Sequence, residues 1–332
     1  MIEIIGDLGA FIIKAIVIVA SIIVLTSFFV SLALKQKEDQ EGFSLKNLTK
    51  QLHKTTLKLK SSFLNKKDRK ALLKAEKKDL KGNENKTKNK VFIIDFEGDI
   101  KASGAESLKK CVTQCINLLD PAKDEVVIRL ESPGGMVSGY GLAASELSRL
   151  REANIKLTIC VDKVAASGGY LMSCVADQIL VAPFAILGSI GVVAGMPNVH
   201  KLLKKNDIEY DVLTAGKFKR TLTVFGENTP EGKEKFIEQL EQIHNLFKSF
   251  VSKYRPKLDI EEVATGEYWF GEDALNLKLA DKIQTSEDYI LDLVKEKEVF
   301  ILSYNEKKKL TDRLMESAKA NLFKGLSPSD FF

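Results

Sequence analysis

The chain has 332 residues, of which 45% are hydrophobic and 29% are charged. This is enough apolar sequence for one large or two modest domains with a real core, and it excludes disorder throughout. The formal net charge of +5 is uneven: residues 46–90 hold 16 Lys and Arg against 4 Asp and Glu, which is +12, so the rest carries −7. The basic character therefore belongs to one segment.

The first element along the chain is an apolar run over residues 15–34, AIVIVASIIVLTSFFVSLAL. Its 20 residues without a charge match the length of a helix that crosses about 30 Å of hydrocarbon. We predict an N-terminal transmembrane anchor within residues 1–34. A cleaved signal peptide is the alternative, but the run is longer than a signal-peptide core and no basic segment precedes it.

Residues 35–90 are rich in lysine and have few apolar side chains to bury. This composition predicts a solvated, partly helical linker that holds the following domain away from a bilayer. Attraction to anionic lipid head groups is an alternative role. Aromatic residues are almost absent from the segment, so we expect no nucleic-acid binding.

A folded domain is predicted over residues 91–290, followed by a C-terminal extension over 291–332. Strands predicted at 91–96, 125–130, 156–161 and 178–182 alternate with helices near 107–119, at 138–153 and from 166 onward. This alternation indicates α/β layers around a largely parallel sheet. Next come a predicted strand over Glu209–Thr214, a long amphipathic helix over Pro230–Tyr254, and a turn, short helix and strand over Gly266–Ile283.

Three glycine-bearing segments follow predicted strands: residues 131–135 (ESPGG), 165–169 (AASGG) and 188–191 (GSIG). Ligands of open α/β sheets bind outside the carboxyl ends of the strands, so we expect these loops to converge on one site. Glycine lets backbone N–H groups approach a ligand closely, as stabilisation of a tetrahedral oxyanion requires. Gly135 and Gly168 are the candidate donors.

Ser167 lies between small residues at the entry to a predicted helix, which suits an exposed, activated hydroxyl. Helix capping is the alternative, and for an isolated Ser-Gly-Gly it is the commoner role. None of the three histidines lies in a motif with a carboxylate. The sequence therefore gives little support for a Ser/His/Asp triad. A lysine can act as the base if burial lowers its pKa, and Lys217 and Lys219 both follow a predicted strand. The residues alone do not choose between them.

The four cysteines lie in apolar stretches, without CxxC spacing or a nearby histidine; they are Cys111, Cys115, Cys160 and Cys174. We therefore expect small buried side chains and not a zinc site. No metal or other cofactor is expected.

A set of ordered motifs supports a more specific interpretation. The segments LESPGG, VDKVAASGGY, GSIGVV, TAGKFKRTLT and GEYWFGEDALNLKLAD together resemble the bacterial signal peptide peptidase A family, and in particular its single-unit, N-terminally anchored members. The resemblance implies a Clp protease/crotonase-like α/β spiral of strand-strand-helix units. It also implies assembly into homo-oligomers and cleavage of peptides or unfolded proteins.

The same resemblance implies roles for individual residues. Ser167 is the expected nucleophile and Lys219 the expected general base, with Ser189 orienting the lysine amine. The oxyanion donors are expected to be the backbone N–H groups of Gly135 and Gly168. The resemblance thus favours one of the two lysines that the residues left open.

Together these features predict a membrane-anchored serine endopeptidase with a Ser/Lys dyad, acting on fragments of signal peptides or membrane proteins. Two alternatives remain, a catalytically idle scaffold tethered to the membrane and a crotonase-type acyl-thioester enzyme. We expect a single pass through a bacterial inner membrane. The lysines that follow the apolar run place the domain in the cytoplasm by the positive-inside rule, whereas the resemblance implies the periplasmic side.

Overall fold

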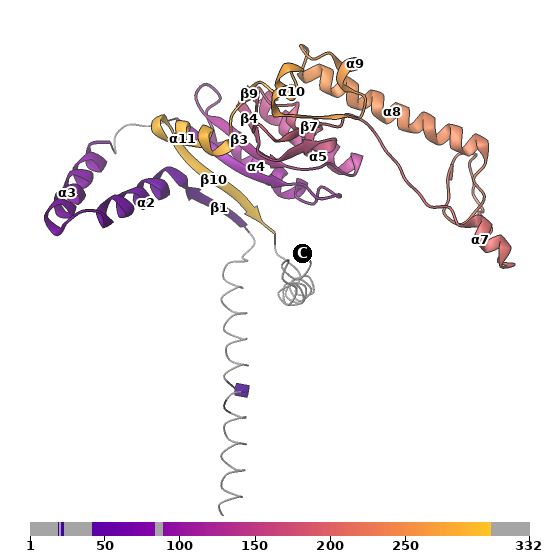
Figure 1. The fold of residues 1–332 in the computed structure, drawn as a ribbon, viewed down its shortest axis with the longest axis horizontal. Coiled ribbons are helices and arrows are strands. Elements are labelled where there is room, and N and C mark those ends of the chain that lie inside the picture. Colours follow the sequence, from indigo (N-terminus) through magenta and orange to yellow (C-terminus); the bar gives the residue numbers. More distant parts are fainter. Residues whose placement is uncertain (1–18, 20, 23–41, 84–88, 307–332) are drawn as a thin grey trace, which may run out of the picture. The chain divides into compact units, whose positions relative to one another are not determined.

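The computed structural model describes residues 19, 21–22, 42–83 and 89–306 (Figure 1). The chain divides into a larger compact unit, Leu45–Ser303, and a smaller one made of Met1–Ser44 and Tyr304–Phe332. Within the smaller unit the rings of Phe43 and Tyr304 meet edge to face, with centroids 5.0 Å apart. The three glycine-bearing motifs of the sequence all fall in the larger unit.

A seven-stranded sheet with the strand order β1-β10-β2-β3-β4-β6-β9 forms the centre of the fold. The strand pairs from β10 to β9 are all parallel. Buried residues run almost without interruption along β2, as expected for a parallel strand covered on both faces. The predicted α/β architecture is confirmed. The strands are β1 (Gly42–Asn47), β2 (Lys90–Glu97), β3 (Glu125–Glu131), β4 (Lys156–Val161), β6 (Gln178–Val181), β9 (Lys282–Ile283) and β10 (Glu298–Asn305).

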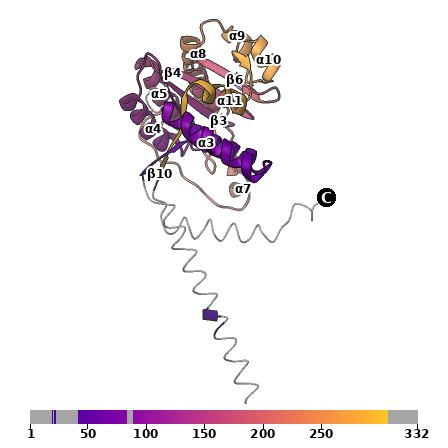
Figure 2. The same cartoon turned by 90° about the vertical axis from the view of Figure 1, so that its left-hand side faces the viewer.

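Helices cover the sheet. α4 (Ala105–Leu118) and α5 (Val137–Glu152) lie side by side (Figures 1 and 2). Cys111 and Cys115 lie on the buried face of α4, one helical turn apart, and all four cysteines of the chain are buried thiols outside disulfides. α11 (Ser286–Glu296) packs on a cluster that contains Val91, Ile93, Val127, Cys160, Leu180, Ile290, Leu293 and Val299.

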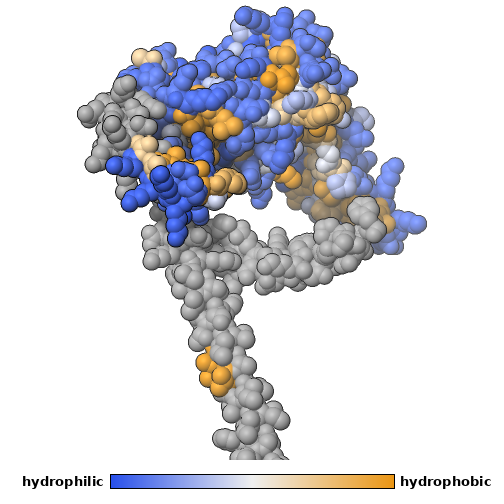
Figure 3. All heavy atoms as spheres, turned by 60° about the vertical axis from the view of Figure 1, so that its left-hand side comes forward, coloured by the Kyte–Doolittle hydropathy of each residue, from blue (hydrophilic) through white to orange (hydrophobic). Residues whose placement is uncertain are grey.

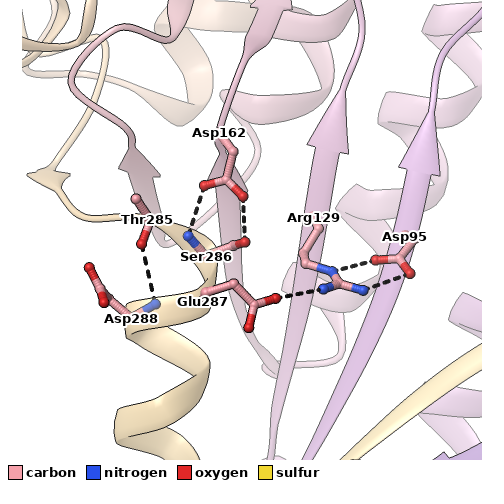
Figure 4. Close-up of polar contacts among 7 residues, drawn as sticks. All are labelled: Asp95, Arg129, Asp162, Thr285, Ser286, Glu287 and Asp288. Atoms are coloured by element: carbon pink, nitrogen blue, oxygen red, sulfur yellow. Dashed lines mark hydrogen bonds and ion pairs between the residues drawn. The ribbon is translucent and has the colours of Figure 1, made fainter.

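Polar contacts attach the first turn of α11 to the sheet (Figure 4). Ser286 donates to Asp162 from its backbone N–H at 2.8 Å and from its hydroxyl at 2.5 Å. Arg129 binds Asp95, its neighbour across the β2/β3 ladder, with two hydrogen bonds of 2.6 and 2.9 Å. Its remaining nitrogen lies 3.3 Å from Glu287. These contacts connect three strands to one helix terminus.

Glu125, at the start of β3, is a fully buried carboxylate. It accepts hydrogen bonds from Thr158 (2.7 Å), Tyr289 (2.5 Å) and Lys297 (2.7 Å), and the Lys156 ammonium lies 3.2 Å away. A charge can be buried in this way only because it is paired and hydrogen-bonded. The cluster links β3 to β4 and to α11.

A small second sheet positions the candidate site. β5 (Val164–Ala166) pairs in parallel with β7 (Ile186–Gly188), which pairs antiparallel with β8 (Tyr268–Phe270). Because β4 leads into β5 and then into α6 (Gly168–Ser173), and β6 leads into β7, the strands from β4 to β7 alternate between the two sheets. The loops after β5 and β7 therefore end at the same edge.

The segment between β7 and the long helix α8 (Pro230–Tyr254) differs from expectation. The predicted strand at Glu209–Thr214 is wrong: these residues have no regular structure and are exposed. A strand needs a neighbour for its backbone groups, and the described residues offer this stretch no ladder. The segment carries only the short α7 (His200–Lys205) and projects from the sheet (Figure 1). By contrast, the prediction of α8 is confirmed at both ends. After α8 come α9 (Ile260–Val263) and α10 (Gly271–Asn276).

The lysine-rich segment over residues 35–90 contains more regular secondary structure than the partly helical linker that its composition predicts. It includes β1 and the helices α2 (Leu48–Ser62) and α3 (Lys66–Asn83). Asn47 caps α2 by accepting from the Lys50 N–H at 2.8 Å, and Leu48 packs against the sheet's core cluster. Hydrophilic side chains cover most of the face seen in Figure 3.

No helix within the described ranges is long and apolar enough to cross a membrane. The predicted span over residues 15–34 lies outside those ranges, apart from Val19, Ser21 and Ile22. The C-terminal extension is likewise outside them from residue 307 onward.

Candidate active site

Ser167 occupies a strained turn between β5 and α6. Its backbone has φ 51° and ψ −117°, a left-handed conformation that costs a non-glycine residue about 1–3 kcal/mol. The turn is fixed by hydrogen bonds from the Ser167 N–H to the Gly188 carbonyl (2.8 Å) and from the Leu171 N–H to the Ser167 carbonyl (2.9 Å). The Ser167 side chain makes no capping hydrogen bond to α6. The capping alternative therefore has no support here, and the hydroxyl is left for another role.

The loop after β3 packs directly against this turn. Gly134 has φ +90°, and a methyl group built on it would lie 2.7 Å from the Ser167 Cβ and 2.8 Å from the Gly168 nitrogen. Only a glycine with a left-handed backbone allows so close an approach. The loop that carries Gly134 and Gly135 thereby lies against the Ser167–Gly168 backbone.

Both predicted oxyanion donors border the same cavity as Ser167. Within residues 89–306, the N–H groups of Gly135 and Gly168 have no hydrogen-bond acceptor. Backbone donors that are left unpaired beside a hydroxyl are what an oxyanion site requires.

Ser189 borders the cavity from the end of β7. It also has a left-handed backbone, with φ 51°, and its N–H donates to the Glu267 carbonyl at 2.6 Å. The parallel pairing of β5 and β7 places Ala166 opposite Gly188, so the two strained serines follow paired residues. The structure thus brings Ser167, Ser189 and the two glycines together as the sequence predicted.

The cavity has a volume of about 1070 Å³. Apart from the glycines and serines, its walls are mainly apolar side chains, which come from α5, α6, the loop after β7 and α8: Val137, Leu171, Val192, Ile243, Leu246, Phe247 and Phe250. A pocket of this size and composition accommodates apolar side chains of a peptide.

Neither candidate lysine is among the described residues that line the cavity. Lys217 and Lys219 are both exposed on the projecting segment, and Lys217 pairs with Glu231 of α8 at 2.6 Å. The ring of Phe218 lies 5.5 Å from the Lys235 ammonium. Along α8 the cavity wall begins only at Ile243, about 12 Å farther on at 1.5 Å per residue. One chain therefore does not bring Ser167 and Lys219 together.

His244 is a cavity residue that the sequence analysis did not select. Its Nε2 lies 3.2 Å from the Ile190 carbonyl oxygen, which connects α8 to the loop that carries Ser189. The signal was present in α8, where Ile243, Phe247 and Phe250 continue the same face at helical spacing.

No cluster of three or more His, Cys, Asp or Glu side chains suited to a metal occurs in the described part of the chain. Burial raises the pKa of the Cys160 thiol to about 12, and it raises the pKa of Cys115 and Cys174 as well. Thiols held in the protonated form are poor metal ligands and poor nucleophiles.

Comparison with known proteins gives a consistent set of relatives. Residues 149–300 match Peptidase family S49, and residues 3–147 match Peptidase family S49 N-terminal. The "Probable protease SohB" of Haemophilus influenzae is 46% identical over 331 residues, which cover 96% of this chain and 94% of the relative. The "Probable protease SohB" of Buchnera aphidicola subsp. Schlechtendalia chinensis is 56% identical over 201 residues, covering 60% and 66% of the two chains.

Solved structures show a more distant similarity. A lysine-to-alanine mutant of the 1510-N membrane-bound stomatin-specific protease, in complex with a substrate peptide, is 13% identical. It covers 70% of this chain and 99% of its own, with a TM-score of 0.42.

Proposed function

This chain belongs to peptidase family S49, and from that premise we propose that it is a membrane-anchored serine endopeptidase that uses a Ser167/Lys219 dyad. The observation that carries the proposal is the strained turn of Ser167. Its hydroxyl lies beside two unpaired backbone N–H groups at the edge of an apolar cavity. Such a hydroxyl flanked by preorganised donors suits attack on a carbonyl.

The proposed reaction begins with neutral Lys219, which takes the proton of the Ser167 hydroxyl while the serine oxygen forms a bond to a peptide carbonyl carbon. The carbonyl oxygen becomes an oxyanion that the Gly135 and Gly168 N–H groups stabilise. Collapse of this intermediate breaks the C–N bond, and the lysine returns the proton to the leaving amine. Water then hydrolyses the acyl-serine ester by the same steps. Ser189 orients the lysine amine.

A second copy of the chain supplies Lys219 in this proposal. Two observations support the idea: Lys219 is exposed within residues 194–229, none of which lines the cavity of its own chain, and this stretch exposes apolar side chains. Leu213, for example, is 93% exposed. Several exposed apolar side chains on one segment are typical of a protein interface. An interface would also remove the lysine from water, which favours the neutral amine that a base needs.

The substrate class follows from the cavity. Its apolar lining favours peptides with large aliphatic or aromatic side chains near the cleaved bond, and fragments of signal peptides and membrane proteins are rich in such residues. An extended peptide would enter beside Ser167 and direct alternate side chains into the cavity.

The membrane anchor of the proposal is the apolar run over residues 15–34. The side on which the domain lies is decided by a fusion of alkaline phosphatase to the C-terminus, because the phosphatase folds only on the periplasmic side. An active fusion restricts the substrates to periplasmic peptides, and an inactive one restricts them to cytoplasmic peptides.

A digestion assay tests the proposed function. Full-length protein purified in detergent should cleave casein and an apolar signal-peptide sequence, and Ser167→Ala should not. Ser173→Ala is the matched control, since that buried serine donates to the Gly169 carbonyl at 3.0 Å outside the cavity. If the wild-type protein binds these peptides without cleaving them, the chain is a scaffold and the proposal is wrong.

A further inference from the structure

Two fully buried polar side chains lie next to the candidate site, and one of them, Tyr140, lines its cavity. Ser132 follows β3, and Tyr140 lies in the second turn of α5. Their hydroxyl oxygens are 2.6 Å apart. The proposed mechanism uses neither, and buried polar groups are costly unless they form hydrogen bonds.

The direction of each hydrogen bond in this pair is determined. The Tyr140 hydroxyl donates its only proton to the Asp99 carbonyl oxygen at 2.8 Å, since a carbonyl cannot donate. The Ser132 hydroxyl must then donate to the Tyr140 oxygen. A lone pair of Ser132 remains, and it accepts from the Gly134 N–H at 3.1 Å. Burial raises the pKa of Tyr140, so the phenol stays protonated.

This chain of hydrogen bonds fixes the loop that presents the Gly135 N–H. The Ser132 hydroxyl accepts from the Gly134 N–H and so holds the peptide group between Pro133 and Gly134. On the other side, the Met136 N–H donates to the Ile100 carbonyl at 2.7 Å, and the Gly135 α-carbon packs against the same carbonyl so closely that a Cβ would collide with it. The peptide between Gly134 and Gly135 is therefore held from both ends.

The same two residues also contact the second donor. The Tyr140 ring packs on the Gly168 α-carbon, where an added Cβ would lie 2.7 Å from the tyrosine Cβ. A Cβ on Gly169 would lie 2.6 Å from the Ser132 carbonyl oxygen. Ser132 and Tyr140 thus contact the backbone next to both candidate oxyanion donors.

We propose that Ser132 and Tyr140 are positioning residues that hold the Gly135 and Gly168 N–H groups at the spacing an oxyanion requires. The inference rests on the proposed peptidase function. Donors that are preorganised in this way act on the transition state more than on the bound substrate. Loss of the hydroxyl chain should therefore slow the chemical step and leave peptide binding almost unchanged.

The test compares Tyr140→Phe and Ser132→Ala with Tyr170→Phe in the full-length protein. Tyr170 is the matched control because it is equally buried and donates to a backbone carbonyl, that of Leu279, at 3.1 Å. We expect kcat to fall about 10- to 100-fold in the first two variants, the range for misplaced catalytic groups. The control should retain wild-type kcat.

Two binding measurements separate positioning from a general loss of structure. A peptidyl boronate that forms a tetrahedral adduct on Ser167 should bind Tyr140→Phe and Ser132→Ala more weakly by the same factor as kcat. A fluorescent uncleaved peptide, measured by anisotropy with Ser167→Ala added to each variant, should bind with unchanged affinity. Circular dichroism at the assay temperature establishes that the variants are folded.

The inference is overturned if both variants keep wild-type kcat and boronate affinity, or if peptide binding weakens as much as boronate binding. Failure of the proposed function gives a different result. In that case the wild-type protein has no Ser167-dependent cleavage and forms no boronate adduct, whatever residues occupy positions 132 and 140.

Discussion

Gly134 and Ser167 are in direct contact: a methyl group on the glycine would lie 2.7 Å from the Ser167 Cβ. The left-handed backbone of Gly134, with φ +90°, adds a conformational cost of about 1–2 kcal/mol for any other residue. Gly134→Ala should therefore displace the nucleophile and lower kcat/KM by at least about 100-fold. Gly195→Ala is the control, because open space surrounds that glycine. Wild-type kcat/KM in Gly134→Ala would show that the contact does not matter for catalysis.

The two lysines of the projecting segment should differ sharply. Lys219→Met removes the proposed general base, so kcat/KM should fall about 10²- to 10⁴-fold. Lys217→Met removes only an exposed ion pair with Glu231, and the activity should remain near the wild-type value. Initial rates on one fluorogenic peptide give the comparison. The assignment of the base is wrong if Lys217→Met is the inactive variant.

If Lys219 acts on the Ser167 of another copy, two inactive variants should complement each other. Ser167→Ala and Lys219→Met would be purified separately, mixed in detergent and assayed after subunit exchange. Random pairing makes roughly a quarter of the interfaces productive, so about that fraction of wild-type activity should return. A mixture that stays inactive, although light scattering shows that the copies have exchanged, contradicts a shared site.

Glu125 gives a prediction about acid stability. Burial by itself would raise its pKa, but the hydrogen bonds that it accepts outweigh burial, so its pKa lies below the ordinary value of 4.5. A lowered folded pKa means that the ionised group stabilises the fold above about pH 4.5 and that this contribution is lost as pH falls through the folded pKa. Denaturant unfolding measured from pH 7 to pH 3 should show this loss.

Glu125→Gln should lower the free energy of unfolding at pH 7 by about 3 kcal/mol, since it leaves buried partners without their charge. Its stability should then depend less on pH below 4.5 than that of the wild type. Glu238→Gln, on the exposed face of α8, is the control and should change little. An unchanged pH dependence in Glu125→Gln would mean that other carboxylates govern acid unfolding.

The hydrophobic periodicity and composition of single segments predicted most strands and helices of the fold, because secondary structure of this kind depends mainly on local sequence. The apolar strand before Glu97 and the helix over Pro230–Tyr254 were both predicted this way. The stretch Glu209–Thr214 has a strand-like composition but no partner strand, and pairing is decided by tertiary structure. Sequence reasoning over one segment cannot detect that.

At the candidate site, too, the sequence predicted some features, whereas others depend on tertiary structure. The motif order placed Ser167 and Ser189 on neighbouring loops, and the parallel pairing of β5 and β7 explains why they lie together. His244 was overlooked, because its role depends on which loop α8 packs against. For Lys219 the resemblance selected the residue, but its distance from the cavity depends on the course of the segment between β7 and α8.

The most direct test of the central claim is mass spectrometry of the full-length protein after treatment with a peptidyl fluorophosphonate. We expect one covalent adduct per chain, located on Ser167 by peptide mapping, with loss of all peptidase activity. Lys219→Met should acquire the adduct far more slowly, because its serine lacks the proposed base. Cleavage that continues without an adduct, or an adduct on Ser189 in place of Ser167, would show that Ser167 is not the nucleophile.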